Sequence, residues 1–176
     1  MALDLQAARD DEESMPKGDS ETHDVIIVGA GAAGIGVGIG IAHVGIENFL
    51  IVDRDTIGSS FSSWPEETRF ITPSFPSNSI GMLDLNSIAI GISPAFSMKV
   101  EHPTGKEYAK HLQDIAEYFE LPILENTNVD SIEKIDDLFH LNIRGSNLLA
   151  KNVIWAAGEY QYPLLDGFEG VELCRH

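Results

Sequence analysis

Short apolar runs alternate with helical spacings along the chain. Apolar side chains recur every three or four residues after Thr104, so we predict a helix there, with Glu107 completing a capping box. A helix is also predicted over 32–44, directly after an apolar run. The runs with the length and pattern of strands are 25–28, 49–52, 121–124, 129–135, 139–143, 148–150 and 153–158.

The order of these elements indicates the fold class. Residues 56–103 are rich in Ser, Pro and Gly, and we expect an extended excursion with short elements there. The full order is then β-α-β, excursion, α, β, β-hairpin and β. This order is typical of an α/β nucleotide-binding domain with a parallel sheet.

Glycines interrupt the first predicted helix. Gly36, Gly38 and Gly40 alternate with apolar residues inside 32–44. Each glycine costs about 1 kcal/mol relative to alanine in a helix interior. We therefore expect alanine at these positions to stabilise the helix, unless the glycines make close contacts with a neighbouring sheet.

Two segments near the N-terminus could be mistaken for a secretory signal or a membrane span. Residues 1–22 are polar and charged, so we predict a disordered acidic extension and no secretory signal. Residues 25–46 carry no charged side chain and are long enough to span a membrane. Seven of these 22 residues are glycine and no Lys or Arg bias flanks them, so we predict a strand, a turn and a helix instead.

Composition and charge narrow the function classes. The chain has 176 residues and 43% hydrophobic content, enough for one domain over 23–176. Its net charge of −17 argues against nucleic acid and anionic membranes as partners, and we expect a cytoplasmic protein. Adaptation to high salt is an alternative explanation of the acidity.

Cysteine and histidine give no sign of a metal or redox site. The lone cysteine, Cys174, excludes a disulfide or CxxC pair within the chain. The six histidines lack metal-ligand spacing, so no metal site is predicted. No catalytic constellation of side chains is predicted either.

A glycine fingerprint follows the first predicted strand. Gly29, Gly31 and Gly34 form a G-x-G-x-x-G pattern, and Asp53 follows at the end of the second strand. The first glycine permits a tight turn, the second admits a pyrophosphate, and the third lets helix and strand pack closely. The helix start then faces the phosphates, and Asp53 can accept hydrogen bonds from the adenosine ribose. The predicted cofactor-binding turn consists of Gly29, Ala30, Gly31, Ala32, Ala33 and Gly34.

The fingerprint does not separate FAD from NAD, but a resemblance does. Residues 23–176 resemble the FAD domain of the pyridine nucleotide-disulfide oxidoreductases and flavin-containing monooxygenases. The stretches that carry the resemblance are 24–34, 52–64, 126–130 and 153–163. The resemblance implies a Rossmann-like, glutathione-reductase-like FAD/NAD(P)-binding domain with a parallel sheet and an inserted β-meander.

The resemblance also implies roles for single residues. The loop after Asp53 is expected to include Ser60 and to place Trp64 near the flavin, although packing within the loop is an equal alternative for Trp64. Thr127-Asn128-Val129 matches a Thr-x-Val pattern that places a backbone group, here at Val129, on the adenine. The domain exit beside the cofactor is expected at Ala156, Ala157 and Gly158. Arg54 is expected to neutralise an ADP phosphate or to accept an NADP 2′-phosphate.

The resemblance implies an FAD-dependent, monooxygenase-like oxidoreductase that receives hydride from NAD(P)H. In that architecture, an NAD(P)H domain and a C-terminal FAD segment follow the exit. We expect both to be absent from this chain, so that a partner chain could supply the NAD(P)H domain. The alternatives are a non-catalytic dinucleotide-binding module and an NAD-only Rossmann protein. The substrate and the electron acceptor stay undefined.

Overall fold

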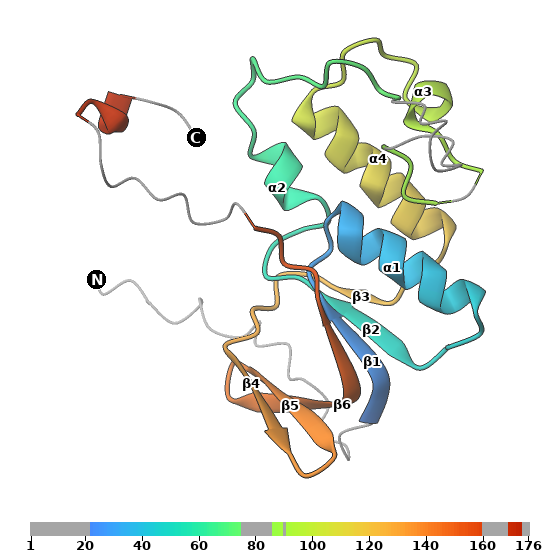
Figure 1. Cartoon of the computed structure of the whole chain (residues 1–176), viewed down its shortest axis with the longest axis vertical. Coiled ribbons are helices and arrows are strands. Elements are labelled where there is room, and N and C mark those ends of the chain that lie inside the picture. Colours follow the sequence, from blue (N-terminus) through green and yellow to red (C-terminus); the bar gives the residue numbers. More distant parts are fainter. Residues whose placement is uncertain (1–21, 75–85, 90, 160–168, 174–176) are drawn as a thin grey trace, which may run out of the picture.

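Six strands form one sheet in the order β3-β2-β1-β6-β5-β4 (Figure 1). The computed structural model describes residues 22–74, 86–89, 91–159 and 169–173. The strands are β1 (Thr22–Val28), β2 (Phe49–Val52), β3 (Ile123–Leu124), β4 (Ser131–Ile135), β5 (Leu138–Ile143) and β6 (Ser146–Trp155). Thr22 belongs to β1, so the predicted extension over 1–22 is one residue too long. Its other residues lie outside the described ranges.

One half of the sheet is parallel. The central strand β1 pairs in parallel with β2 on one side and with β6 on the other, and β2 pairs in parallel with β3. Val28 at the end of β1 lies beside both Val52 and Trp155. The carboxyl ends of β1, β2 and β6 therefore meet at one edge of the sheet.

The other half is an antiparallel meander of β4, β5 and β6. The prediction of separate strands at 148–150 and 153–158 is wrong, because both belong to the single strand β6, which ends at Trp155. Asp24 of β1 bonds to the polar pair Lys151 and Asn152, which lies between the two apolar runs of β6. Its carboxylate accepts a 2.7 Å bond from Lys151 Nζ, and its backbone oxygen accepts a 3.0 Å bond from Asn152. The strand therefore continues through the polar pair.

The two long helices start where they were predicted, and the first ends one residue before its predicted end. The helices are α1 (Ala32–His43), α2 (Ser59–Ser62), α3 (Pro94–Ser97), α4 (Gly105–Tyr118) and a short 3-10 turn, η1 (Val171–Leu173). The capping box of α4 is confirmed, because Thr104 Oγ1 accepts from Glu107 N and the Glu107 carboxylate accepts from Thr104 N. None of the described helices has the length and apolar character needed to cross a membrane.

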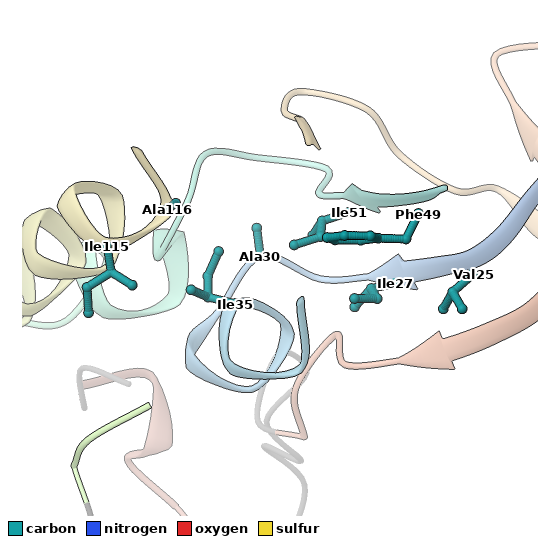
Figure 2. Packing of buried hydrophobic residues seen from close by; sticks show 8 residues of the cluster. All are labelled: Val25, Ile27, Ala30, Ile35, Phe49, Ile51, Ile115 and Ala116. Carbon is teal, nitrogen blue, oxygen red and sulfur yellow. The ribbon is translucent and has the colours of Figure 1, made fainter. Parts of the chain in front are cut away.

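The core has two parts, one on each face of the sheet. Val25 and Ile27 of β1 belong to one cluster with Ile35 of α1 and Ile115 of α4 on the helical face, and Figure 2 shows how the members of this cluster lie. The alternate residues of β1 face a second cluster. Its buried members are Ile26, Val28, Val52, Leu141, Ile143 and Ala150. β1 is thus buried on both faces of the sheet.

Of the three alternating glycines inside α1, Gly36 and Gly38 make close contacts. A Cβ at Gly38 would lie 2.7 Å from Cδ1 of buried Ile51, and one at Gly36 would lie 3.2 Å from the Ile88 carbonyl oxygen. A Cβ at Gly40 would meet nothing within 4 Å. Glycine therefore lets the middle of α1 approach β2 and the segment at residue 88, whereas Gly40 makes no such contact.

Candidate dinucleotide-binding site

The sheet topology itself locates a candidate binding site. The chain leaves β1, forms α1 and returns to β2 on one side, while β6 occupies the other side. In open α/β sheets, ligands bind outside the carboxyl ends of the strands at such a reversal of strand order. The turn from Gly29 to Gly34 lies at this place (Figure 1).

The first and third glycines of the turn are required by its geometry. Gly29 has a φ of +113°, and its N–H donates a 2.8 Å bond to the Val52 oxygen. A Cβ at Gly29 would overlap the Ala156 carbonyl, and one at Gly34 would overlap the Gly29 carbonyl. Side chains at either position would push apart the turn, the helix and the β6 exit.

The second glycine leaves an open space at the start of α1. Gly31 is the N-cap of α1, and a Cβ added there would meet nothing within 4 Å. No side chain caps this helix end, and its first turn holds no acidic residue. Because the first N–H groups of a helix have no intrahelical partners, this end suits a phosphate anion. The residues present therefore fit a pyrophosphate, and the binding of one stays a prediction.

Asp53 is directly bonded to the glycine turn. Its Oδ2 accepts a 2.6 Å bond from the N–H of Ala30, and its Oδ1 accepts a 2.8 Å bond from the N–H of Asp55. A carboxylate offers about four acceptor positions, so two remain for hydroxyl donors. The structure thus brings together the fingerprint glycines and the predicted ribose acid.

The exit of β6 also reaches this site. The Ala156 N–H donates a 2.8 Å bond to the Val28 oxygen, and Ala157 lies beside Gly29. Gly158 follows with a φ of +84° and is exposed. Ala156 and Ala157 therefore border the start of the glycine turn, and a cofactor contact at Gly158 stays a prediction.

Three other residues predicted to bind the cofactor lie outside the glycine turn and the exit of β6. They are Arg54, Ser60 and Val129. Arg54 is exposed and forms a 3.1 Å ion pair with Asp55, and Ser60 is exposed on α2. Val129 packs against the second core cluster. Their contacts with a cofactor stay predictions.

Trp64 packs within an aromatic cluster. Its ring centroid lies 5.4 Å from that of Phe61 and 5.0 Å from that of Phe70. Both phenylalanine rings also contact the ring of Tyr108 of α4, Phe61 in an edge-to-face arrangement and Phe70 in a tilted one. These contacts fit the packing alternative for Trp64. Proximity to the flavin stays a prediction.

Glu125 is a residue near the site that was not predicted from the sequence. This residue directly follows β3, and its Oε1 accepts a 2.6 Å bond from the N–H of Ile57 in the loop after β2. An acid at the carboxyl end of a parallel strand is a signal that could have identified it. Among the described residues, no group of three or more His, Cys, Asp or Glu is arranged to hold a metal ion.

A sheet with a parallel half, a glycine turn after β1 and a bonded acid after β2 is the arrangement of Rossmann-like dinucleotide-binding folds. Residues 26–176 match the family model described as pyridine nucleotide-disulphide oxidoreductase. The chain therefore belongs to this family, and the predicted fold class is confirmed.

Three proteins with similar sequence or structure can be compared with this chain. An uncharacterized CzcO-like oxidoreductase of Geobacillus kaustophilus is 40% identical over 67 residues, which cover 38% of this chain and 19% of that protein. The flavin-containing monooxygenase of Stenotrophomonas maltophilia has 20% identity and a TM-score of 0.64, covering 86% of this chain and 43% of that one. OTEMO, solved in complex with FAD and NADP, has 16% identity and a TM-score of 0.62, covering 88% and 29%. The chain spans less than half of the length of each.

Proposed function

We propose that this chain binds the ADP half of FAD, as the cofactor-binding part of an FAD-dependent, monooxygenase-like oxidoreductase. The observation that carries the proposal is the hydrogen bond between Ala30 and Asp53, which joins the phosphate turn to the ribose acid. Family membership supports an oxidoreductase. The flavin, FAD and NADP named for the two solved structures support FAD as cofactor and NAD(P)H as electron donor.

The described residues perform the binding step. The open side of Gly31 admits the pyrophosphate, and the N–H groups at the start of α1 donate hydrogen bonds to its oxygens. Asp53 accepts from the ribose hydroxyls with its remaining acceptor positions. When bound, FAD supplies the redox chemistry by accepting a hydride. The protein contributes orientation, so this function requires no acid–base side chain at the glycine turn.

The proposal is tested by comparing two glycine variants. Gly31→Ala and Gly40→Ala add the same methyl group to opposite ends of α1, each where the free protein has open space. Both variants should fold like the wild type. We expect Gly31→Ala to weaken ADP and FAD binding about tenfold or more, because its methyl occupies the phosphate approach. Gly40→Ala should bind like the wild type, as measured by calorimetry.

The identity of the cofactor has its own readout. If the purified protein shows absorption bands at about 370 and 450 nm, it holds a flavin. Colourless protein that binds ADP but not FAD would support the non-catalytic module, and binding of NAD but not FAD would support the NAD-only alternative. Equal ADP affinity in wild type and Gly31→Ala would overturn the proposed site.

A further inference from the structure

We propose that Glu125 is a positioning residue that sets the preference of the site for a nucleotide with free ribose hydroxyls. The inference rests on the proposed function, since it concerns how Asp53 is presented to the ribose. Glu125 is half-buried, and its Oε1 accepts a 2.6 Å bond from Ile57 N, 68 positions away in the sequence. The argument concerns the segment 53–58, which we call the acid loop.

The acid loop is held along its length by the segment after β3. Residues 125, 126 and 127 of that segment each form a hydrogen bond with one residue of the loop. The bonded loop residues are every second one, 57, 55 and 53. The bonds are Thr127 N to Asp53 O at 2.8 Å, Asn126 N to Asp55 O at 2.9 Å, and Ile57 N to Glu125 Oε1 at 2.6 Å. The regular spacing fixes the register of the whole loop against residues 125–127.

The carboxylate of Glu125 supplies the strongest of these bonds. Hydrogen bonds that involve an ionised group are about twice as strong as neutral ones. The other two bonds join backbone groups, and the Gln113 side chain adds a longer, 3.4 Å bond to the Ile57 oxygen. Glu125 therefore contributes the charge-assisted attachment of the acid loop.

The loop in turn orients Asp53. Oδ1 of Asp53 accepts from Asp55 N within the loop, while Oδ2 accepts from Ala30 in the glycine turn. The far end of the loop also reaches this turn, because Gly58 N donates a 3.0 Å bond to the Ala30 oxygen. Loss of the Glu125 bond frees the loop between Asp55 and Gly58 and loosens the direction of the Asp53 carboxylate. Bonds to ribose hydroxyls depend on that direction, whereas phosphate binding at α1 does not.

The test compares ADP with 2′,3′-dideoxy-ADP, which lacks both ribose hydroxyls, on the full chain by calorimetry. We expect the wild type to prefer ADP by about tenfold. Glu125→Ala should reduce this preference to about twofold, and Glu125→Gln, whose neutral amide oxygen still accepts from Ile57, should fall between them. The matched control Glu133→Ala removes an exposed glutamate on β4 and should keep the wild-type preference.

The ratio of the affinities for the two nucleotides distinguishes a positioning role of Glu125 from a general effect on stability. If Glu125→Ala lowers the affinity for both nucleotides by the same factor, the role of Glu125 is merely structural and the inference is overturned. If Glu125→Ala does not fold, the fall in preference between wild type and Glu125→Gln decides, and an unchanged ratio there overturns the inference. A wild type that binds both nucleotides equally also overturns it. A wild type that binds neither would contradict the proposed function itself.

Discussion

The backbone N–H of Ala30 donates a 2.6 Å hydrogen bond to Oδ2 of Asp53, 23 residues further along the chain. This bond makes the glycine turn after β1 and the acid after β2 a single unit in the free protein. The carboxylate is already oriented before a nucleotide binds. Such preorganisation reduces the ordering cost of binding.

Substitution of Asp53 should affect both stability and binding. Asp53→Ala removes the acceptors of Ala30 N and Asp55 N, so we expect a loss of about 1–3 kcal/mol in unfolding free energy. ADP affinity should fall about tenfold, because the ribose hydroxyls lose their acceptor. Urea denaturation and calorimetry measure the two effects. Asp137→Ala, an exposed carboxylate next to β5, is the control and should change neither.

A methyl group at the third fingerprint glycine should disrupt the fold itself. The Cβ of Gly34→Ala would overlap the Gly29 carbonyl, which is backbone and cannot rotate away. We expect a loss of more than about 2 kcal/mol in unfolding free energy, measured by urea denaturation. Gly31→Ala is the comparison, since it should keep its stability and lose only nucleotide binding. Equal stability of the two variants would contradict the packing described for α1.

The glycines further along α1 should respond in opposite directions. Gly40→Ala has open space and should raise the unfolding free energy by about 0.5–1 kcal/mol. Gly38→Ala places a methyl 2.7 Å from buried Ile51, so steric overlap should outweigh the helix propensity and lower the stability. Thermal unfolding followed by circular dichroism distinguishes the two. A gain at both positions would mean that α1 can shift away from β2.

The sequence predicts those parts of the fold that depend on residues close together in the chain. It does not predict the parts that depend on contacts between distant residues. The strand before Gly29 and the capping box at Thr104 depend on neighbouring residues, and both are confirmed. The polar pair Lys151 and Asn152 looked like a break between strands, because its partner Asp24 lies in another strand. Tertiary contacts therefore override the local pattern there.

The same distinction applies to the candidate site. The glycine pattern and Asp53 predict a turn beside an acid, and the structure brings them into contact. The bond between Glu125 and Ile57 joins segments 68 residues apart, and no periodicity or motif connects them. For Trp64, the sequence left packing and flavin contact equally open, and its aromatic neighbours are Phe61 of α2 and Phe70 of the following loop.

A buried histidine of α4 contacts α3. His111 is 7% exposed, and its Nδ1 lies 3.2 Å from Ser97 Oγ. It lines a cavity of about 700 Å³ together with Glu107, Lys110 and Asp114. Burial lowers the pKa of His111 below its ordinary value, and the nearby Asp114 charge only partly opposes this.

Stability should therefore depend on pH through His111. Because its pKa is lowered in the folded state, the unfolded chain binds more protons once the pH falls below the ordinary histidine pKa of about 6.5. The folded state is then favoured at pH 8 and loses stability between pH 7 and pH 5, by at most about 1.4 kcal/mol for each pH unit. His111→Gln stays neutral, and its amide can still bond Ser97, so its unfolding free energy should vary less over this range. His43→Gln removes an exposed histidine at the end of α1 and should keep the wild-type dependence. Identical pH profiles for wild type and His111→Gln, measured by urea denaturation, would show that His111 does not carry this dependence.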